Sequence, residues 1–197
     1  MAMDCEGAAM NRKVRVKSGK TLYTFAYLRN ASYILFKLAK STTSGQAHMY
    51  LASMLLSAFS MEAYLNHLGS ETIPYWATLE RRLGPGEKLD VLTKHLLPSI
   101  DPAKKPFHTF SVLFRFRNAI VHGRTEYLTA ESTQFLSEDA IPRLPETKWK
   151  KMISQPMAER FLADTKSMIQ ILQAAAHLEP GLLYTSEEAG WSEELMN

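Results

Sequence analysis

The chain has 197 residues, of which 46% are hydrophobic, and this is enough to bury one core of ordinary size. Its formal net charge of +3 is too small to predict nucleic-acid binding, and its single cysteine, Cys5, excludes an intramolecular disulfide and a cysteine-based zinc site. No apolar run is long enough to span a bilayer, and the first residues lack the apolar stretch of a secretory signal. We therefore expect a cytoplasmic protein with no membrane partner.

The two ends of the chain differ in charge. Lysine and arginine dominate the charged residues of 1–40, whereas the charged residues of 178–197 are all glutamate. Residues 1–20 are predicted to form a flexible basic arm and residues 179–197 an acidic tail. The arm could attract phosphates and the tail could shield that surface, or both could be solvated ends without a further role.

Hydrophobic periodicity predicts an all-α domain over residues 21–178, with four long helices and two short ones. The expected elements in chain order are a helix at 21–40, a helix at 46–68, two short helices within 75–97, a helix from Pro106 to about His122, a long irregular connection at 128–155 and a last helix at 156–178. Four long amphipathic helices in one small domain indicate a helical bundle.

Glycine and proline mark the expected breaks between these helices. Gly69 and Gly123 are placed as helix ends, and Pro106 suits the first turn of a helix. Val14 and Val16 alternate with basic residues, which allows a short extended piece, but the strand signal is otherwise negligible.

An arginine interrupts the apolar stripe of the helix that begins at Pro106. The stripe follows the i, i+4, i+7, i+11 spacing of one helix face and consists of Phe110, Phe114, Arg117 and Val121. Burying an unpaired guanidinium costs on the order of several kcal/mol, so an anion must compensate Arg117. A carboxylate, a partner chain or a bound phosphate would serve.

The helix at 46–68 contains a matching irregularity. Its apolar face continues into two polar residues and consists of Ala52, Leu55, Phe59, Glu62 and Asn66. A carboxylate and a guanidinium that both lie on apolar stripes suggest each other as partners. A Glu62–Arg117 pair could orient the arginine for chemistry, or it could only fix the register of two helices.

Arg117, Asn118 and His122 together form a plausible set for handling phosphate. Arginine is always charged and binds phosphate oxygens through two N–H groups, while histidine exchanges a proton near neutral pH. Asn118 and His122 are four residues apart and can touch, but Arg117 and His122 lie roughly 140° apart on an ideal helix. They converge on one ligand only if the helix loosens near Gly123 or a second subunit supplies the missing half.

Two segments of the sequence are similar to those of the HEPN superfamily. The string RNAIVH, Arg117 to His122, matches that family's R-x4-H motif, with the preferred polar residue, Asn118, directly after the arginine and Gly123 behind it. Residues 59–66 resemble the second helix of such domains, and the resemblance covers roughly residues 21–123 in order.

The resemblance implies an up-and-down four-helix bundle with extra short helices, commonly a homodimer in which two motifs meet. It also implies a metal-independent endoribonuclease that cleaves RNA by attack of the 2′-hydroxyl, with the role of a toxin or of a defence or stress effector. On that reading Arg117, His122 and Asn118 are catalytic, Glu62 and Asn66 support them, and no cofactor is needed. No histidine spacing in the chain suggests a metal site.

The alternative is a catalytically inactive HEPN module that dimerises and binds a protein or a nucleotide. In some HEPN toxins a tyrosine two residues after the motif histidine is modified by a paired antitoxin. Here that position is Arg124, and the nearest downstream tyrosine is Tyr127. An antitoxin partner would therefore have to act by another route.

Overall fold

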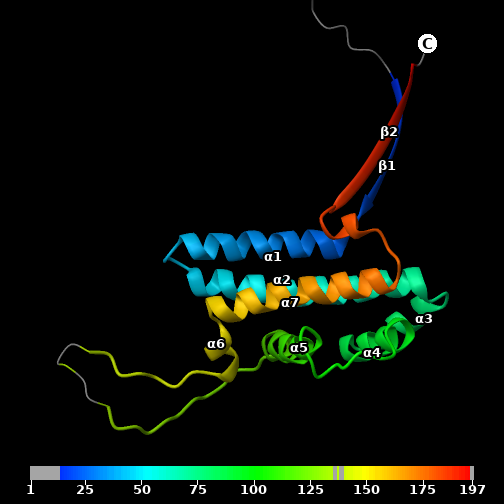
Figure 1. Cartoon of the computed structure of the whole chain (residues 1–197). Coiled ribbons are helices and arrows are strands. Elements are labelled where there is room, and N and C mark those ends of the chain that lie inside the picture. Colours follow the sequence, from blue (N-terminus) through cyan, green and yellow to red (C-terminus); the bar gives the residue numbers. More distant parts are fainter. Residues whose placement is uncertain (1–13, 135–136, 138–139, 196–197) are drawn as a thin grey trace, which may run out of the picture.

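The computed structural model describes residues 14–134, 137 and 140–195, and within them the chain is mostly helical with one small sheet (Figure 1). The elements in chain order are β1 (Val14–Leu22), α1 (Thr24–Ser41), α2 (Gln46–Thr72), α3 (Trp76–Glu80), α4 (Pro85–Leu96), α5 (Phe107–Val121), α6 (Lys148–Met152), α7 (Gln155–Ala175), the 3-10 helix η1 (Pro180–Leu183) and β2 (Glu187–Leu195). None of the described helices combines the length and the apolar content needed to cross a lipid bilayer.

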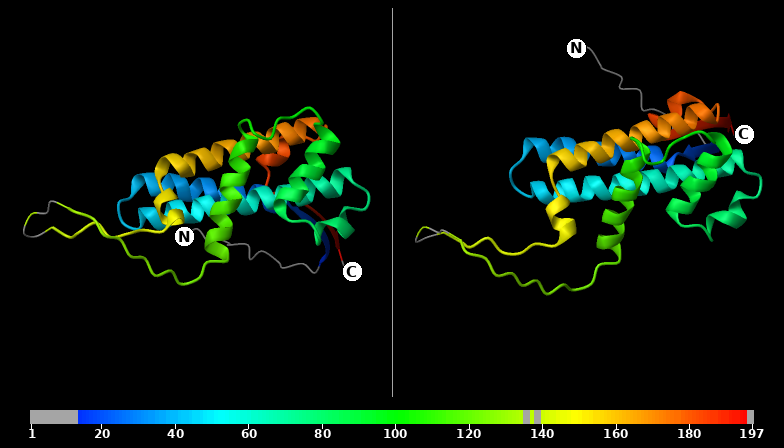
Figure 2. Two further views of the ribbon diagram at one scale, coloured as in Figure 1. Left: turned by 90° about the horizontal axis from the view of Figure 1, so that it is seen from below. Right: turned by 60° about the horizontal axis from the view of Figure 1, so that its bottom comes forward.

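Three long helices, α1, α2 and α7, lie side by side, and α5 crosses them at a steep angle in both views of Figure 2. Small polar residues hold α1 against α2, because the buried Ser32 hydroxyl donates to the Ser53 carbonyl (2.7 Å) and lies 2.9 Å from the Ser57 hydroxyl. The predicted predominance of helix is thus confirmed. A regular four-helix bundle is not, since α5 runs across the other helices.

Helix α2 does not end where the sequence analysis places its end. It continues through Gly69 to Thr72, so the expected stop at Gly69 is wrong. Gly69 is buried because the indole of Trp76, which begins α3, packs directly on the helix backbone there. A Cβ at residue 69 would lie 2.0 Å from Trp76 Cε2, so a glycine is needed for this close approach rather than for a turn.

The irregular connection before the last helix is present but shorter than predicted. Residues 123–147 contain no helix or strand among those described, and α6 then forms within the segment expected to be irregular. The α6 sequence has too few apolar residues for a periodic signal, but the Thr147 hydroxyl caps this helix by accepting a hydrogen bond from the Lys150 amide. Ser154 caps α7 in the same way, through the Met157 amide (3.4 Å).

The two ends of the described chain form an antiparallel ribbon that projects from the helical body (Figure 1). The alternation at Val14 and Val16 predicts only a short extended piece, and no signal predicts the sheet, because the partner of each strand lies at the other end of the sequence. The basic β1 pairs with the acidic β2, and the Lys20 ammonium lies 2.6 Å from a carboxylate oxygen of Glu187. Of the predicted basic arm, residues 1–13 lie outside the described part. The predicted acidic tail contains η1 and β2.

Tyr64 lies in the core without a partner for its hydroxyl among the described residues. Burial raises the pKa of Tyr64, since only the neutral phenol is tolerated there. A tyrosine in the unfolded chain ionises near pH 10, so the stability contributed by the neutral form is present below that pH and is lost as the pH rises above it.

We expect Tyr64→Phe to leave the free energy of unfolding at pH 7 unchanged or to raise it by about 1 kcal/mol, because it removes an unsatisfied buried hydroxyl. The variant should also lose less stability than the parent between pH 9 and pH 11. Urea unfolding at pH 7, pH 9 and pH 11 measures this, with the exposed Tyr27→Phe as the control. A loss above about 1 kcal/mol at pH 7 would mean that the hydroxyl has a partner.

Candidate functional site

Arg117 lies near the C-terminal end of α5 with 18% of its side chain exposed. Its Nη2 donates to a carboxylate oxygen of Glu62 on α2 (2.8 Å), and its Nη1 donates to the side-chain oxygen of Asn118 (2.9 Å). The guanidinium carbon lies 5.7 Å from the centre of the Phe59 ring. Glu62, the expected partner, therefore provides at least part of the negative charge that a guanidinium on an apolar stripe requires.

The Arg117 guanidinium is neither fully buried nor fully hydrogen-bonded. Its Nε is buried and has no hydrogen-bond partner within the described residues, while the Glu62 side chain is 25% exposed. An ion pair of this kind, half-buried and linked to a neighbouring amide, fixes the direction of the guanidinium and still leaves part of it facing solvent.

His122 follows the last residue of α5 and is exposed. Its backbone amide donates to the carbonyl of Asn118 (3.0 Å), but its ring has no hydrogen-bond or ion-pair partner in the described part of the chain. The chain leaves the helix tightly after it, because a Cβ at Gly123 would lie 2.9 Å from the carbonyl oxygen of Ala119. The expected helix end before Gly123 is thus present, and it presents the imidazole to solvent.

Asn66 lies one turn after Glu62 on α2, but its side chain has a different partner. Its side-chain oxygen accepts from the ammonium of Lys88 on α4 (2.7 Å), and Lys88 is 5% exposed. The structure therefore brings Arg117, Glu62 and Asn118 into contact, but it links Asn66 to α4, and among the described residues no hydrogen bond joins Arg117 to the imidazole of His122.

Sequence reasoning overlooks Lys88 and the basic residues of α6. Lys88 and Leu92 are four residues apart on the buried side of α4, so the reasoning that singles out Arg117 applies to Lys88 as well. The α6 sequence KWKKM provides three lysines and Trp149, immediately after the irregular connection. A hollow of about 620 Å³ at the end of α5 is lined by Ala119 and Gly123 on one side and by residues 146–149 and 151 on the other.

Two further observations bear on the site. Within the part of the chain that the structure describes, no three histidine, cysteine or acidic side chains gather as a metal site would require. No protein-family model, curated protein or solved structure matches the chain. Function is therefore inferred from the residues and their geometry.

Proposed function

We propose that this protein is a metal-independent endoribonuclease of the HEPN type, in which α1, α2, α5 and α7 correspond to the four helices of that family's bundle. The observation that supports this best is the end of α5, where an oriented, partly exposed Arg117 and an exposed His122, whose ring has no polar partner among the described residues, occupy the R-x4-H positions. The charge and the proton exchange needed to cleave RNA are both supplied by these two side chains.

The proposed reaction forms a bond between the RNA 2′-oxygen and the adjacent phosphorus while the bond from phosphorus to the 5′-oxygen breaks. The products are a 2′,3′-cyclic phosphate and a free 5′-hydroxyl. The imidazole of His122 removes the proton from the 2′-hydroxyl or returns one to the leaving oxygen. Arg117 stabilises the negative charge that develops on the phosphoryl oxygens, and Glu62 and Asn118 hold it in direction.

The distance along the helix between the two residues favours a homodimer with a composite site. Arg117 and His122 are separated by roughly 140° around an ideal helix, and the hydrogen bonds of the Arg117 guanidinium within the described residues go to Glu62 and Asn118. If the α5 ends of two copies face each other, the arginine of one copy and the imidazole of the other can reach one phosphate. RNA is then the substrate, and a toxin or a defence or stress effector controlled by an antitoxin protein is the role that follows.

A catalytically inactive module that dimerises and binds a protein or a nucleotide is the second candidate. The observation in its favour is that Arg117 is already paired with Glu62, as it would be if the pair only set the register of α2 and α5.

Incubation of the purified protein with end-labelled RNA in excess chelator tests the first proposal against the second. We expect cleavage of the RNA, none of DNA with the same sequence, and products that end in 2′,3′-cyclic phosphate. An oligonucleotide with a single 2′-deoxy substitution at a mapped cleavage site should resist cleavage there. Intact RNA in every sequence tried would leave the inactive module as the better proposal.

A further inference from the structure

Described residues of the irregular connection and of α6 line a trough beside the proposed catalytic residues. A hollow of about 1110 Å³ is lined by Ala130, Ser132 and Gln134 on the outgoing part of the connection and by residues 143–146 on its returning part. The hollow of about 620 Å³ at the end of α5 continues it, because Glu146 and Lys151 line both. We call these two hollows together the α6 trough.

The lining of the α6 trough is basic. Its charged residues are Arg124, Arg143, Lys148, Lys150 and Lys151, against Glu126 and Glu146. An excess of positive charge in a concave surface concentrates polyanions.

Both carboxylates of the trough already have partners. Glu146 lies 2.9 Å from the ammonium of Lys150, and Glu126 accepts a hydrogen bond from the indole of Trp149 (3.2 Å). The hydrogen bond from Lys150 lowers the pKa of Glu146, with further contributions from the charges of Lys151 and Arg143. Glu146 therefore stays ionised and offsets one of the three neighbouring cations, so a net positive charge remains.

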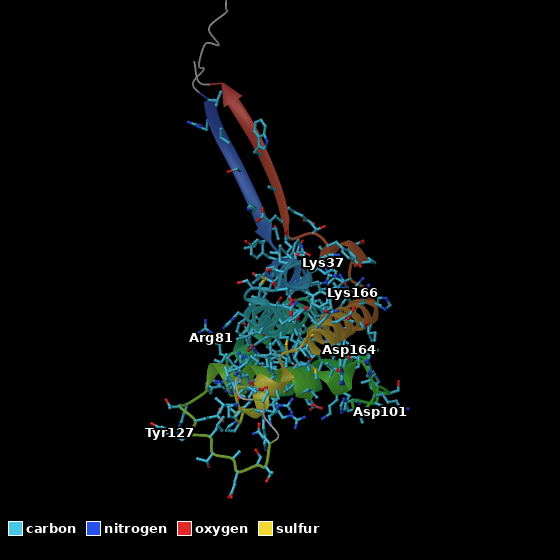
Figure 3. All side chains as sticks on the ribbon, turned by 90° about the vertical axis from the view of Figure 1, so that its left-hand side faces the viewer. Lys37, Arg81, Asp101, Tyr127, Asp164 and Lys166 are labelled. Carbon is cyan, nitrogen blue, oxygen red and sulfur yellow. The ribbon has the colours of Figure 1, made fainter. Side chains whose placement is uncertain are left out.

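The trough begins at the proposed catalytic helix end. Ala119, within the R-x4-H motif, and Gly123, directly after His122, both line it. The connection lies away from the β1–β2 ribbon, as the positions of Tyr127 and the ribbon in Figure 3 show. A polyanion in the trough would thus pass beside His122 and not beside the acidic strand β2.

We propose that the α6 trough binds the backbone of single-stranded RNA next to the cleaved phosphate, with Lys148 and Lys151 contacting phosphates. Trp149 lies between these two lysines in the sequence, is half-buried and lines the trough. An unpaired base can stack on the part of its ring that faces the trough, and this favours a single strand over a duplex. The inference rests on the proposed function for its choice of RNA, but binding can be measured without cleavage.

The test uses a fluorescent single-stranded oligoribonucleotide and fluorescence anisotropy, in chelator and in a His122→Ala background so that the RNA stays intact. Reversal of two charges in the trough, Lys148→Glu with Lys151→Glu, should weaken binding at least about tenfold and reduce the dependence of log affinity on log salt by about 1.4, the value for two phosphate contacts to a single strand. The matched control, Lys37→Glu with Lys40→Glu, reverses two exposed charges on α1 and should bind like the parent.

Unchanged affinity in the trough variant, or an equal loss in the α1 control, would overturn the proposal. So would equal competition by duplex RNA or by vesicles of anionic phospholipid, which would indicate a general polyanion surface. Unfolding midpoints of all variants exclude loss of fold as the cause. A failure of the enzyme proposal would give a different result. The parent would bind RNA and the trough variant would bind it more weakly, but protein with His122 intact would not cleave RNA.

Discussion

Replacement of His122 by alanine is expected to lower the rate of RNA cleavage in chelator by about 10²- to 10⁴-fold, the usual contribution of a general acid or base. The fold should be unaffected, because the ring is exposed and has no hydrogen-bond or ion-pair partner among the described residues. Single-turnover cleavage rates and the unfolding midpoint of the same preparation measure the two effects. Cleavage by the variant at the parental rate would assign the activity to another residue or to a contaminating nuclease.

Arg117 requires a sharper control, since its substitution also removes a contact between α2 and α5. Glu62→Gln removes the ion pair but leaves the guanidinium in place, next to Asn118. If Arg117 contacts the phosphate, Arg117→Ala lowers cleavage far more than Glu62→Gln does. Equal losses from both would indicate that the pair acts only by holding the two helices together.

Gly69→Ala is expected to lower the free energy of unfolding by about 3 kcal/mol, at the upper end of the usual cost of overpacking a core. The sign is opposite to that of helix propensity, by which alanine would stabilise a helix interior by up to about 1 kcal/mol. The reason is the Trp76 indole, which is 1% exposed and whose Cε2 lies 2.0 Å from the position of the added Cβ.

Urea unfolding measures this effect, and Gly86→Ala in α4 is the matched control. Apart from its chain neighbours and the backbone of α4 itself, no heavy atom of the described residues lies within 4 Å of a Cβ at residue 86, so helix propensity should decide and stability should stay the same or rise slightly. A Gly69→Ala variant as stable as the parent would show that Trp76 can move away from α2 at little cost.

Much of the helical part could be predicted because its signals are local. Apolar residues recur at helical spacing in α1, α2, α5 and α7, and these helices appear close to their expected positions. Gly69 shows the limit of such reasoning, since a glycine that ends a helix and one that admits an indole look the same in sequence. Of the two strands, only the start of β1 has a local signal, the alternation at Val14 and Val16, and the pairing of β1 with β2 could not be predicted because the two lie at opposite ends of the chain.

The candidate site could likewise be predicted only in part. The Glu62–Arg117 contact could be inferred because both charged groups lie on apolar stripes and each needs the other. Asn66 lies on the same stripe as Glu62, but its partner is Lys88, a residue on a separate short helix that no pattern connects to α2. The direction of the His122 ring depends on how the chain leaves α5, and spacing along an ideal helix does not determine that.

The ribbon also affects the order in which parts of this protein can fold during synthesis. Tyr23 donates to Glu188, 165 residues further along the chain, so β1 emerges from the ribosome long before β2 exists. The helices can pack before β1 finds its partner, because pairing between segments so far apart in the chain requires closure of a long loop and is slow. A product halted after α7 would retain the helices but leave β1 as an unpaired edge open to foreign strands. Protection of the β1 amides from hydrogen exchange would therefore report that β2 had been made and had paired with β1.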